Sequence, residues 1–215
     1  MNNPLTTLRA YTRGEHRADA VIHVLGILFA INASAWLLFN VTGISVLVSV
    51  SVYCAGLLAM IGFSAAYNLM PHHRPSKQVL RRLDHSAIFL MIAGTYTPLA
   101  VNRVGGFWGD LVLAVMWCCA TFGIVMKLLF PRRFEMASVA FYLIMGWMGV
   151  MLIKPLSMSV AGADLWLLLA GGLIYSVGVA FYLIERIPFH KAIWHAFVLL
   201  AAILQFAAIA HEFAA

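Results

Sequence analysis

The sequence predicts an all-α, polytopic membrane protein: a single-domain bundle of seven transmembrane helices. Of its 215 residues, 63% are hydrophobic and 10% are charged, whereas a soluble domain averages about 25% charged residues. The mean hydropathy is +0.93. A spanning helix needs about 20 mostly apolar residues, and such windows follow one another at 18–41, 44–69, 84–102, 107–130, 135–153, 163–184 and 190–212. Almost no sequence remains for a soluble domain, so residues 1–215 are predicted to form one membrane domain.

Most of the positive charge falls at one end of this predicted bundle. Twelve of the 14 lysines and arginines belong to that end: Arg9, Arg13, Arg17, Arg74, Lys77, Arg81, Arg82, Lys127, Arg132, Arg133, Arg186 and Lys191. Arg103 and Lys154 fall at the other end. The positive-inside rule therefore predicts a cytoplasmic N-terminus and an outside C-terminus. The net charge is +6. Because the positive residues are grouped at one end of the helices, we expect them to contact anionic lipid headgroups and not a nucleic acid.

The first helix carries a polar stripe, because Glu15, Asp19 and His23 are spaced i, i+4, i+8 on one face. Ionisable groups at membrane depth are costly and usually face the bundle interior with a partner. Asp19 and His23 are therefore predicted to join a buried polar network. For Glu15 two interpretations stay open, the same network or an ion pair with a nearby arginine at headgroup level.

The second and third windows meet at a second set of polar residues. Ser64 and Asn68 share one face near the end of the second helix, and Asp84 is predicted to open the third. Taken singly, the serine would bond its own helix, the asparagine would link helices and the aspartate would complement the helix dipole. Because all three lie at facing ends of two helices, a shared pocket is favoured. The loop between them, 70–83, with His72 and His73, is predicted to touch water and lipid.

The last window begins with Lys191 and His195, an i, i+4 pair at the same end of the bundle. Alone, the lysine would extend its ammonium to the headgroups and the histidine would be a satisfied core residue. Seven-helix topology puts both at the depth of Asp19, Ser64 and Asp84. One shared pocket explains so many polar groups at one depth better than separate causes do. The cysteines Cys54, Cys118 and Cys119 have no metal-binding spacing and are predicted to be small core residues.

At this point the sequence resembles the bacterial hemolysin III family, relatives of the progestin and adipoQ receptors within the ceramidase-like membrane hydrolases. The resemblance is carried by Glu15-x3-Asp19-x3-His23, by Ser64-x3-Asn68, by the stretch from Leu83 to Pro98, by FYLIMGWM around Trp147 and by AIWHAFV around His195. It implies a multi-pass protein of the bacterial inner membrane with a zinc site in the cytoplasmic leaflet. It also implies that zinc is held by a histidine four residues after the serine and by two histidines spaced i, i+4 on the last helix. Ser64 and Asp84 would be the catalytic positions beside a metal-bound water.

This chain departs from that pattern at two of the three ligand positions. Asn68 and Lys191 stand where the family has histidine, and His195 alone matches. A protonated lysine repels a dication, and an amide oxygen is a poor zinc donor beside imidazole. We therefore expect no metal or other cofactor at these positions. A further hypothesis is that the Lys191 ammonium takes the place of the cation and pairs with Asp84.

Three functions remain open. The loss of two ligands favours a non-catalytic protein that acts on membrane lipid state, with membrane lipids as its partners. The first alternative is a metal-dependent lipid amide hydrolase, with metal held by His195 together with His190 or His23. A pore ranks last, because no continuous polar face crosses any helix. The sequence decides neither enzymatic activity nor oligomeric state.

Overall fold

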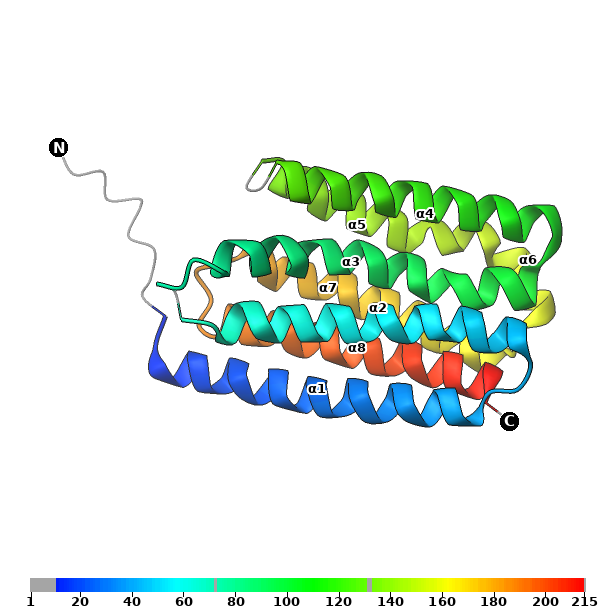
Figure 1. Cartoon of the computed structure of the whole chain (residues 1–215), viewed down its shortest axis with the longest axis horizontal. Helices are drawn as coiled ribbons and strands as arrows, with labels where there is room; N and C mark the ends of the chain where they lie inside the picture. Colours follow the sequence, from blue (N-terminus) through cyan, green and yellow to red (C-terminus); the bar gives the residue numbers. More distant parts are fainter. Residues whose placement is uncertain (1–10, 72, 131–132, 215) are drawn as a thin grey trace.

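The computed structural model describes residues 11–71, 73–130 and 133–214, and nearly all of them are helical. Within these residues, six helices are long and apolar enough to cross a membrane: α1 (Arg13–Asn40), α2 (Ile44–Leu69), α3 (Lys77–Leu99, with a span that continues to Val104), α4 (Gly106–Leu129), α7 (Gly162–Leu183) and α8 (His190–Phe213). They run along one common direction, and α1 packs against α2 and α8 (Figure 1). The all-α polytopic fold is confirmed.

The seventh predicted span is a broken helix. Helix α5 (Glu135–Trp147) continues through the 3-10 segment η2 (Met148–Leu152) into α6 (Ile153–Ser159), and the two parts meet at 55°. Pro155 lies in the first turn of α6 and has no backbone N–H with which to continue a regular helix from α5. The window 135–153 was therefore too short. The described residues form six helices of spanning length and this bent pair, which makes a seventh span if its two parts cross the membrane together.

The third helix begins earlier than predicted, at Lys77 instead of Asp84. Residues 77–83 are good helix formers, and hydropathy missed them because several are charged. Asp84 thus lies about two turns inside α3, so its carboxylate does not cap the helix. The segment η1 (Ala100–Val104), a π-helix, extends α3 at its far end.

The first helix also begins earlier than its apolar window, because Thr12 and Glu15 form a capping box. The Thr12 hydroxyl accepts a hydrogen bond from the Glu15 backbone N–H at 3.2 Å, and the Glu15 carboxylate accepts one from the Thr12 N–H at 2.7 Å. Both orphan N–H groups are satisfied in this way. The cap fixes where the polar stripe of α1 enters the bundle.

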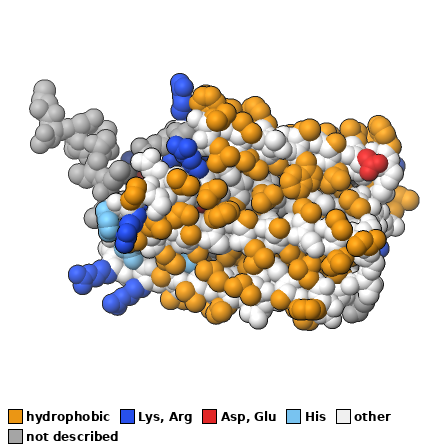
Figure 2. All heavy atoms as spheres, viewed as in Figure 1, with side chains coloured by type: hydrophobic (Ala, Val, Ile, Leu, Met, Phe, Trp, Pro, Cys, Tyr) orange, Lys and Arg blue, Asp and Glu red, His pale blue; other side chains and the backbone are white. Residues whose placement is uncertain are grey.

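The surface has the charge pattern expected of a membrane protein. Hydrophobic side chains cover the flank of the bundle, and most of the visible Lys and Arg side chains gather at the end where α1 begins (Figure 2). We call this the basic end; its described cations are Arg13, Arg17, Arg74, Lys77, Arg81, Arg82, Lys127, Arg133, Arg186 and Lys191. Arg9, His72 and Arg132 lie outside the described residues. Helix α8 finishes at the opposite end (Figure 1), and which end is cytoplasmic stays a prediction.

The three cysteines are not equivalent. Cys54 is buried as predicted, Cys119 is partly buried and Cys118 is exposed on the apolar flank of α4. Adjacent residues on a helix point about 100° apart, so both cannot face the core. Cys54 is therefore a core residue as expected, Cys119 packs against the core around Met116, and the prediction was wrong for Cys118.

Candidate functional site

A cavity of about 580 Å³ lies inside the bundle and reaches the basic end. Six of the site residues predicted from the sequence line it: His23, Ser64, Asn68, Asp84, Lys191 and His195. A smaller hollow of about 290 Å³ adjoins it and includes Asp19 in its lining. The two spaces share Tyr67, Asn68, Arg81 and Lys191. The fold thus brings together residues from α1, α2, α3 and α8 that lie far apart in the sequence.

The polar stripe of α1 meets α8 at Asp19. Its carboxylate oxygen Oδ1 lies 2.6 Å from Nδ1 of His195 and 3.7 Å from Nε2 of His23. The rings of the two histidines are 4.5 Å apart between centroids. Asp19 and His23 are each only 4% exposed, so this cluster is part of the interior.

Glu15 belongs to the helix ends and not to the cavity lining. It is 2% exposed, and besides capping α1 it accepts a hydrogen bond from the backbone N–H of Phe189 at 2.8 Å. Phe189 has a left-handed backbone (φ 61°) at the start of α8. Glu15 therefore fixes the first turn of α1 against the turn that leads into α8, which positions Asp19 opposite His195.

The polar residues of α2 and α3 line the same cavity as His23 and His195. The Asn68 side-chain amide donates to the backbone carbonyl of Ser64 at 2.9 Å and to its hydroxyl at 3.4 Å. Asp84 is partly buried. Its carboxyl group interacts electrostatically with His195 and Arg81 and by a hydrogen bond with the Ser64 side chain. One end of the cavity therefore combines a hydroxyl, an amide, a carboxyl group and an imidazole.

The proposed pairing of Lys191 with Asp84 is not found among the described residues. Lys191 is exposed, and its ammonium lies 5.2 Å from the centroid of the Tyr11 ring. Burial raises the pKa of the Tyr11 phenol, and the charges of Asp19 and Glu15 raise it further, so a neutral ring faces the cation. Because Lys191 is the second residue of α8, its chain is long enough to carry the charge out of the bundle.

The ligand set implied by the family resemblance does not fit zinc. Lys191 offers an ammonium, which has no lone pair, Asn68 offers one amide oxygen, and His195 is the one imidazole. A different set of three lies together: Asp19, His23 and His195 each present one ligand atom, and these atoms lie within 4.8 Å of one another. His190, the other histidine considered for a metal, does not belong to this set.

A partly buried charge cluster beside the cavity was missed by the sequence reasoning. Arg81 on α3 forms an ion pair with Glu135 at the start of α5, and Lys127 on α4 is buried nearby among the lining residues. Glu135 is the one acidic residue in the basic stretch 127–135, which was the available signal. This cluster joins α3, α4 and α5 at the basic end.

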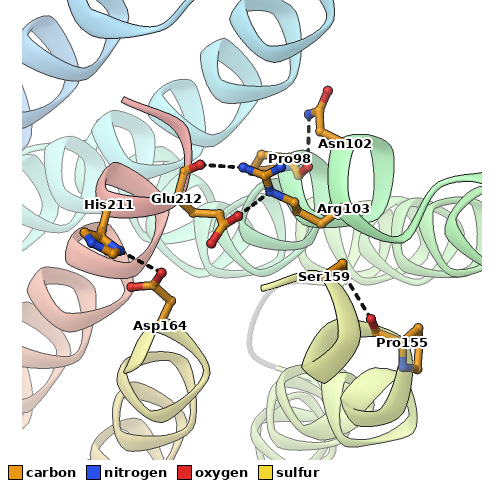
Figure 3. Close-up of polar contacts among 8 residues, drawn as sticks. All are labelled: Pro98, Asn102, Arg103, Pro155, Ser159, Asp164, His211 and Glu212. Atoms are coloured by element: carbon orange, nitrogen blue, oxygen red, sulfur yellow. Dashed lines mark hydrogen bonds and ion pairs between the residues drawn. The ribbon is translucent and has the colours of Figure 1, made fainter. Parts of the chain in front are cut away.

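Polar contacts also close the opposite end of the bundle (Figure 3). Arg103 on η1 donates to the backbone carbonyl of Glu212 at 2.7 Å and pairs with its carboxylate. His211 on α8 lies 2.8 Å from the Asp164 carboxylate on α7. These contacts hold the end of α8 between α7 and η1.

Comparison with known proteins agrees with this architecture. A model of the family described as haemolysin III-related matches residues 12–206. The chain is 39% identical to the hemolysin-3 homolog of Bacillus subtilis (strain 168) over 192 residues, which is 88% of this chain and 90% of that protein. It is 38% identical to hemolysin-3 of Bacillus cereus over 209 residues, 96% of this chain and 94% of the relative. The human monocyte to macrophage differentiation factor is 28% identical over 200 residues, 91% of this chain and 83% of its own length.

The family model covers the polar stripe of α1, the residues that line the cavity and the start of α8. Together with the apolar helices, these matches identify a multi-pass protein of the cell membrane. The chain belongs to the haemolysin III-related family.

Proposed function

We propose that this protein binds a membrane lipid in its cavity and acts on the lipid state of the membrane through that site. The observation that carries the proposal is a cavity of about 580 Å³, with its charged residues at one end and a mostly apolar lining along the rest, inside a bundle that spans a membrane. The headgroup would lie by Ser64, Asp84 and His195, at the basic end. We place that end on the cytoplasmic side, following the distribution of positive charge.

The shape of the cavity supports a chain-like ligand. Its lining follows α3 from Arg81 to Leu99, a length of about 27 Å at 1.5 Å per residue. Away from the basic end the lining is mostly apolar, with Leu156 on α6 and Leu165 and Leu168 on α7. Its polar members there, such as Thr95, Ser176 and Gln205, carry no charge. Such a lining favours an acyl chain, because the hydrophobic effect requires no directional contacts.

The smaller hollow supports an anionic headgroup. Four cations line it: Arg74, Lys77, Arg81 and Lys191. Lys77 is held in place by a hydrogen bond from its ammonium to the Met70 carbonyl at 2.7 Å. Basic side chains at the membrane surface attract anionic lipids, so a phosphate group would be held beside the polar end of the main cavity.

A pair of glycine substitutions tests the lipid-binding proposal. Gly172 lines the cavity, and an added Cβ there would meet nothing within 4 Å; Gly62 on α2 is equally open but does not line it. Gly172→Leu is expected to reduce the lipid that co-purifies with the protein, measured by mass spectrometry after extraction. Gly62→Leu is the matched control and is expected to retain it. Equal retention by both variants would refute the cavity as the binding site.

A second candidate function is hydrolysis of a lipid amide bond. It is favoured by the hydroxyl of Ser64, the carboxyl group of Asp84 and the imidazole of His195 around one cavity, which are residue types used in acid–base chemistry. Release of free fatty acid from an N-acyl lipid that is lost in Asp84→Asn would support it. A pore remains the last-ranked candidate, because the polar lining of the cavity gives way to Leu99, Leu156 and Leu165.

A further inference from the structure

We propose that Asp19, His23 and His195 form a binding site for a divalent transition-metal ion of the zinc type. This site shares only His195 with the ligand positions implied by the family resemblance. It joins α1 to α8, whereas the implied site joins α2 to α8. The proposal is independent of whether a lipid occupies the cavity.

The positions of the three ligand atoms carry the argument. Zinc bonds to nitrogen and oxygen are about 2.0–2.1 Å, so ligand atoms of a tetrahedral site lie about 3.3 Å apart. Oδ1 of Asp19 is 2.6 Å from Nδ1 of His195 and 3.7 Å from Nε2 of His23, and the three residues offer one ligand atom each within 4.8 Å of one another. The two distances from Oδ1 lie on either side of the tetrahedral value, so side-chain adjustment of Asp19, His23 and His195 would be needed to complete the geometry.

The state of His23 is the second, independent observation. Its ring is 4% exposed, yet Nε2 has no hydrogen-bond partner among residues 11–71, 73–130 and 133–214. A buried polar atom without a partner is unfavourable. Nε2 of His23 faces the Asp19 carboxylate. A metal ion bound to that carboxylate would accept the lone pair of Nε2.

The donor set suits the chemistry of zinc. Two imidazoles and one carboxylate are a recurrent ligand combination, and they leave a fourth position open. Asp19 and His23 are spaced i, i+4 on α1 and already share one helix face, and His195 comes from α8. The metal would replace the proton between Asp19 and His195, so its binding releases a proton.

The proposed site does not use the two positions at which this chain lacks the histidines of the family. Lys191 carries its charge outward over Tyr11, and Asn68 is hydrogen-bonded to Ser64, so neither is needed as a ligand. His23 and His195 both line the cavity. A metal at the α1–α8 contact would therefore still face the contents of the cavity.

The test is zinc binding by the detergent-purified chain, prepared with a tag that contains no histidine and stripped with a chelator. Titration with Zn²⁺ is expected to saturate at about one ion per chain and to raise the melting temperature. His23→Gln is expected to weaken binding at least tenfold, since even the outer partners of a metal site contribute about 10–100-fold. His190→Gln, on the same cavity, is the matched control and is expected to bind as the native chain does.

Two results would overturn the proposal. Absence of saturable zinc binding by the native chain would leave Asp19, His23 and His195 as a hydrogen-bonded network, whatever the variants do. Binding that survives in His23→Gln and is lost in Asn68→Ala would instead assign the metal to the positions implied by the resemblance. A melting curve of each variant without metal confirms that it is folded.

Discussion

Asp19 on α1 and His195 on α8 are joined by a hydrogen bond of 2.6 Å between Oδ1 and Nδ1. This contact connects the first and the last helix of the bundle at the basic end, 176 residues apart in the chain. The capping box of Thr12 and Glu15 fixes the start of α1, and the bond from Phe189 to Glu15 fixes the start of α8. The candidate site is therefore built on two helix starts that are tied to each other.

Removing the Asp19 carboxylate should destabilise the protein. Asp19→Leu leaves the Nδ1 atom of His195 without its partner, and the loss of a buried hydrogen bond to a charged group costs about 1–3 kcal/mol. The melting temperature in detergent is expected to fall accordingly. Asp110→Leu, which replaces an exposed aspartate on α4, serves as the control. Equal melting of the two variants would mean that the Asp19–His195 bond contributes no net stability.

The contact of α2 with α3 depends on Gly56. A Cβ at this position would lie 3.2 Å from the Met91 Cα and 3.3 Å from the Leu90 carbonyl oxygen, and backbone atoms cannot move aside cheaply. Gly56→Leu is expected to separate the two helices and to cost about 1–3 kcal/mol or more. Gly62→Leu on the same helix meets open space and should melt like the native chain. Tolerance of both substitutions would show that α2 and α3 can shift apart freely.

The two cations at the end opposite the basic end should differ in importance. Arg103 pairs with Glu212 and lies 5.0 Å from the Phe213 ring centroid, whereas Lys154 is exposed on α6. Arg103→Gln is expected to lower the melting temperature, because hydrogen bonds to charged groups contribute about 1.5–3 kcal/mol. Lys154→Gln should leave it unchanged. If both variants melt alike, the Arg103–Glu212 contact is no stronger than an ordinary surface pair.

The positions implied by the family resemblance should regain metal binding when their histidines are restored. Residues 68, 191 and 195 all line one cavity, and imidazoles at the three positions would supply three good zinc ligands. We expect Asn68→His combined with Lys191→His to bind about one zinc per chain in a His23→Gln background. Metal content after dialysis is the measurement. Failure to bind zinc would mean that residues 68, 191 and 195 are too far apart in this chain to coordinate one ion, even when all three are histidine.

The elements most accurately predicted were those with long apolar windows. The ends of α2, α4 and α8 agree with the windows to within one or two residues, because length and hydropathy alone define a spanning helix. The start of α3 was wrong because charged residues end a hydropathy window without ending a helix. The break between α5 and α6 was missed because Pro155 lay just beyond the predicted window.

For the candidate site, too, the sequence predicted features within single helices but not the contacts between helices. Spacing placed Asp19 with His23, Ser64 with Asn68 and Lys191 with His195 on shared helix faces, and topology placed them at one end. Spacing gave no information on which faces meet. The direction of Lys191 and the ion pair of Arg81 with Glu135 depend on side chains from other helices, so neither followed from the sequence.

By itself the sequence determined that this protein is a helical bundle in a membrane. It also determined which residues are polar at membrane depth and at which end of the bundle they gather. These features follow from hydropathy and from the helical period. Only the tertiary structure decided that Asp19, rather than Asn68 or Lys191, lies against His195. The physical reason is that helix rotation and packing set the contacts between helices. Those depend on close approaches such as Gly56 against Met91 and on caps such as Glu15 with Phe189.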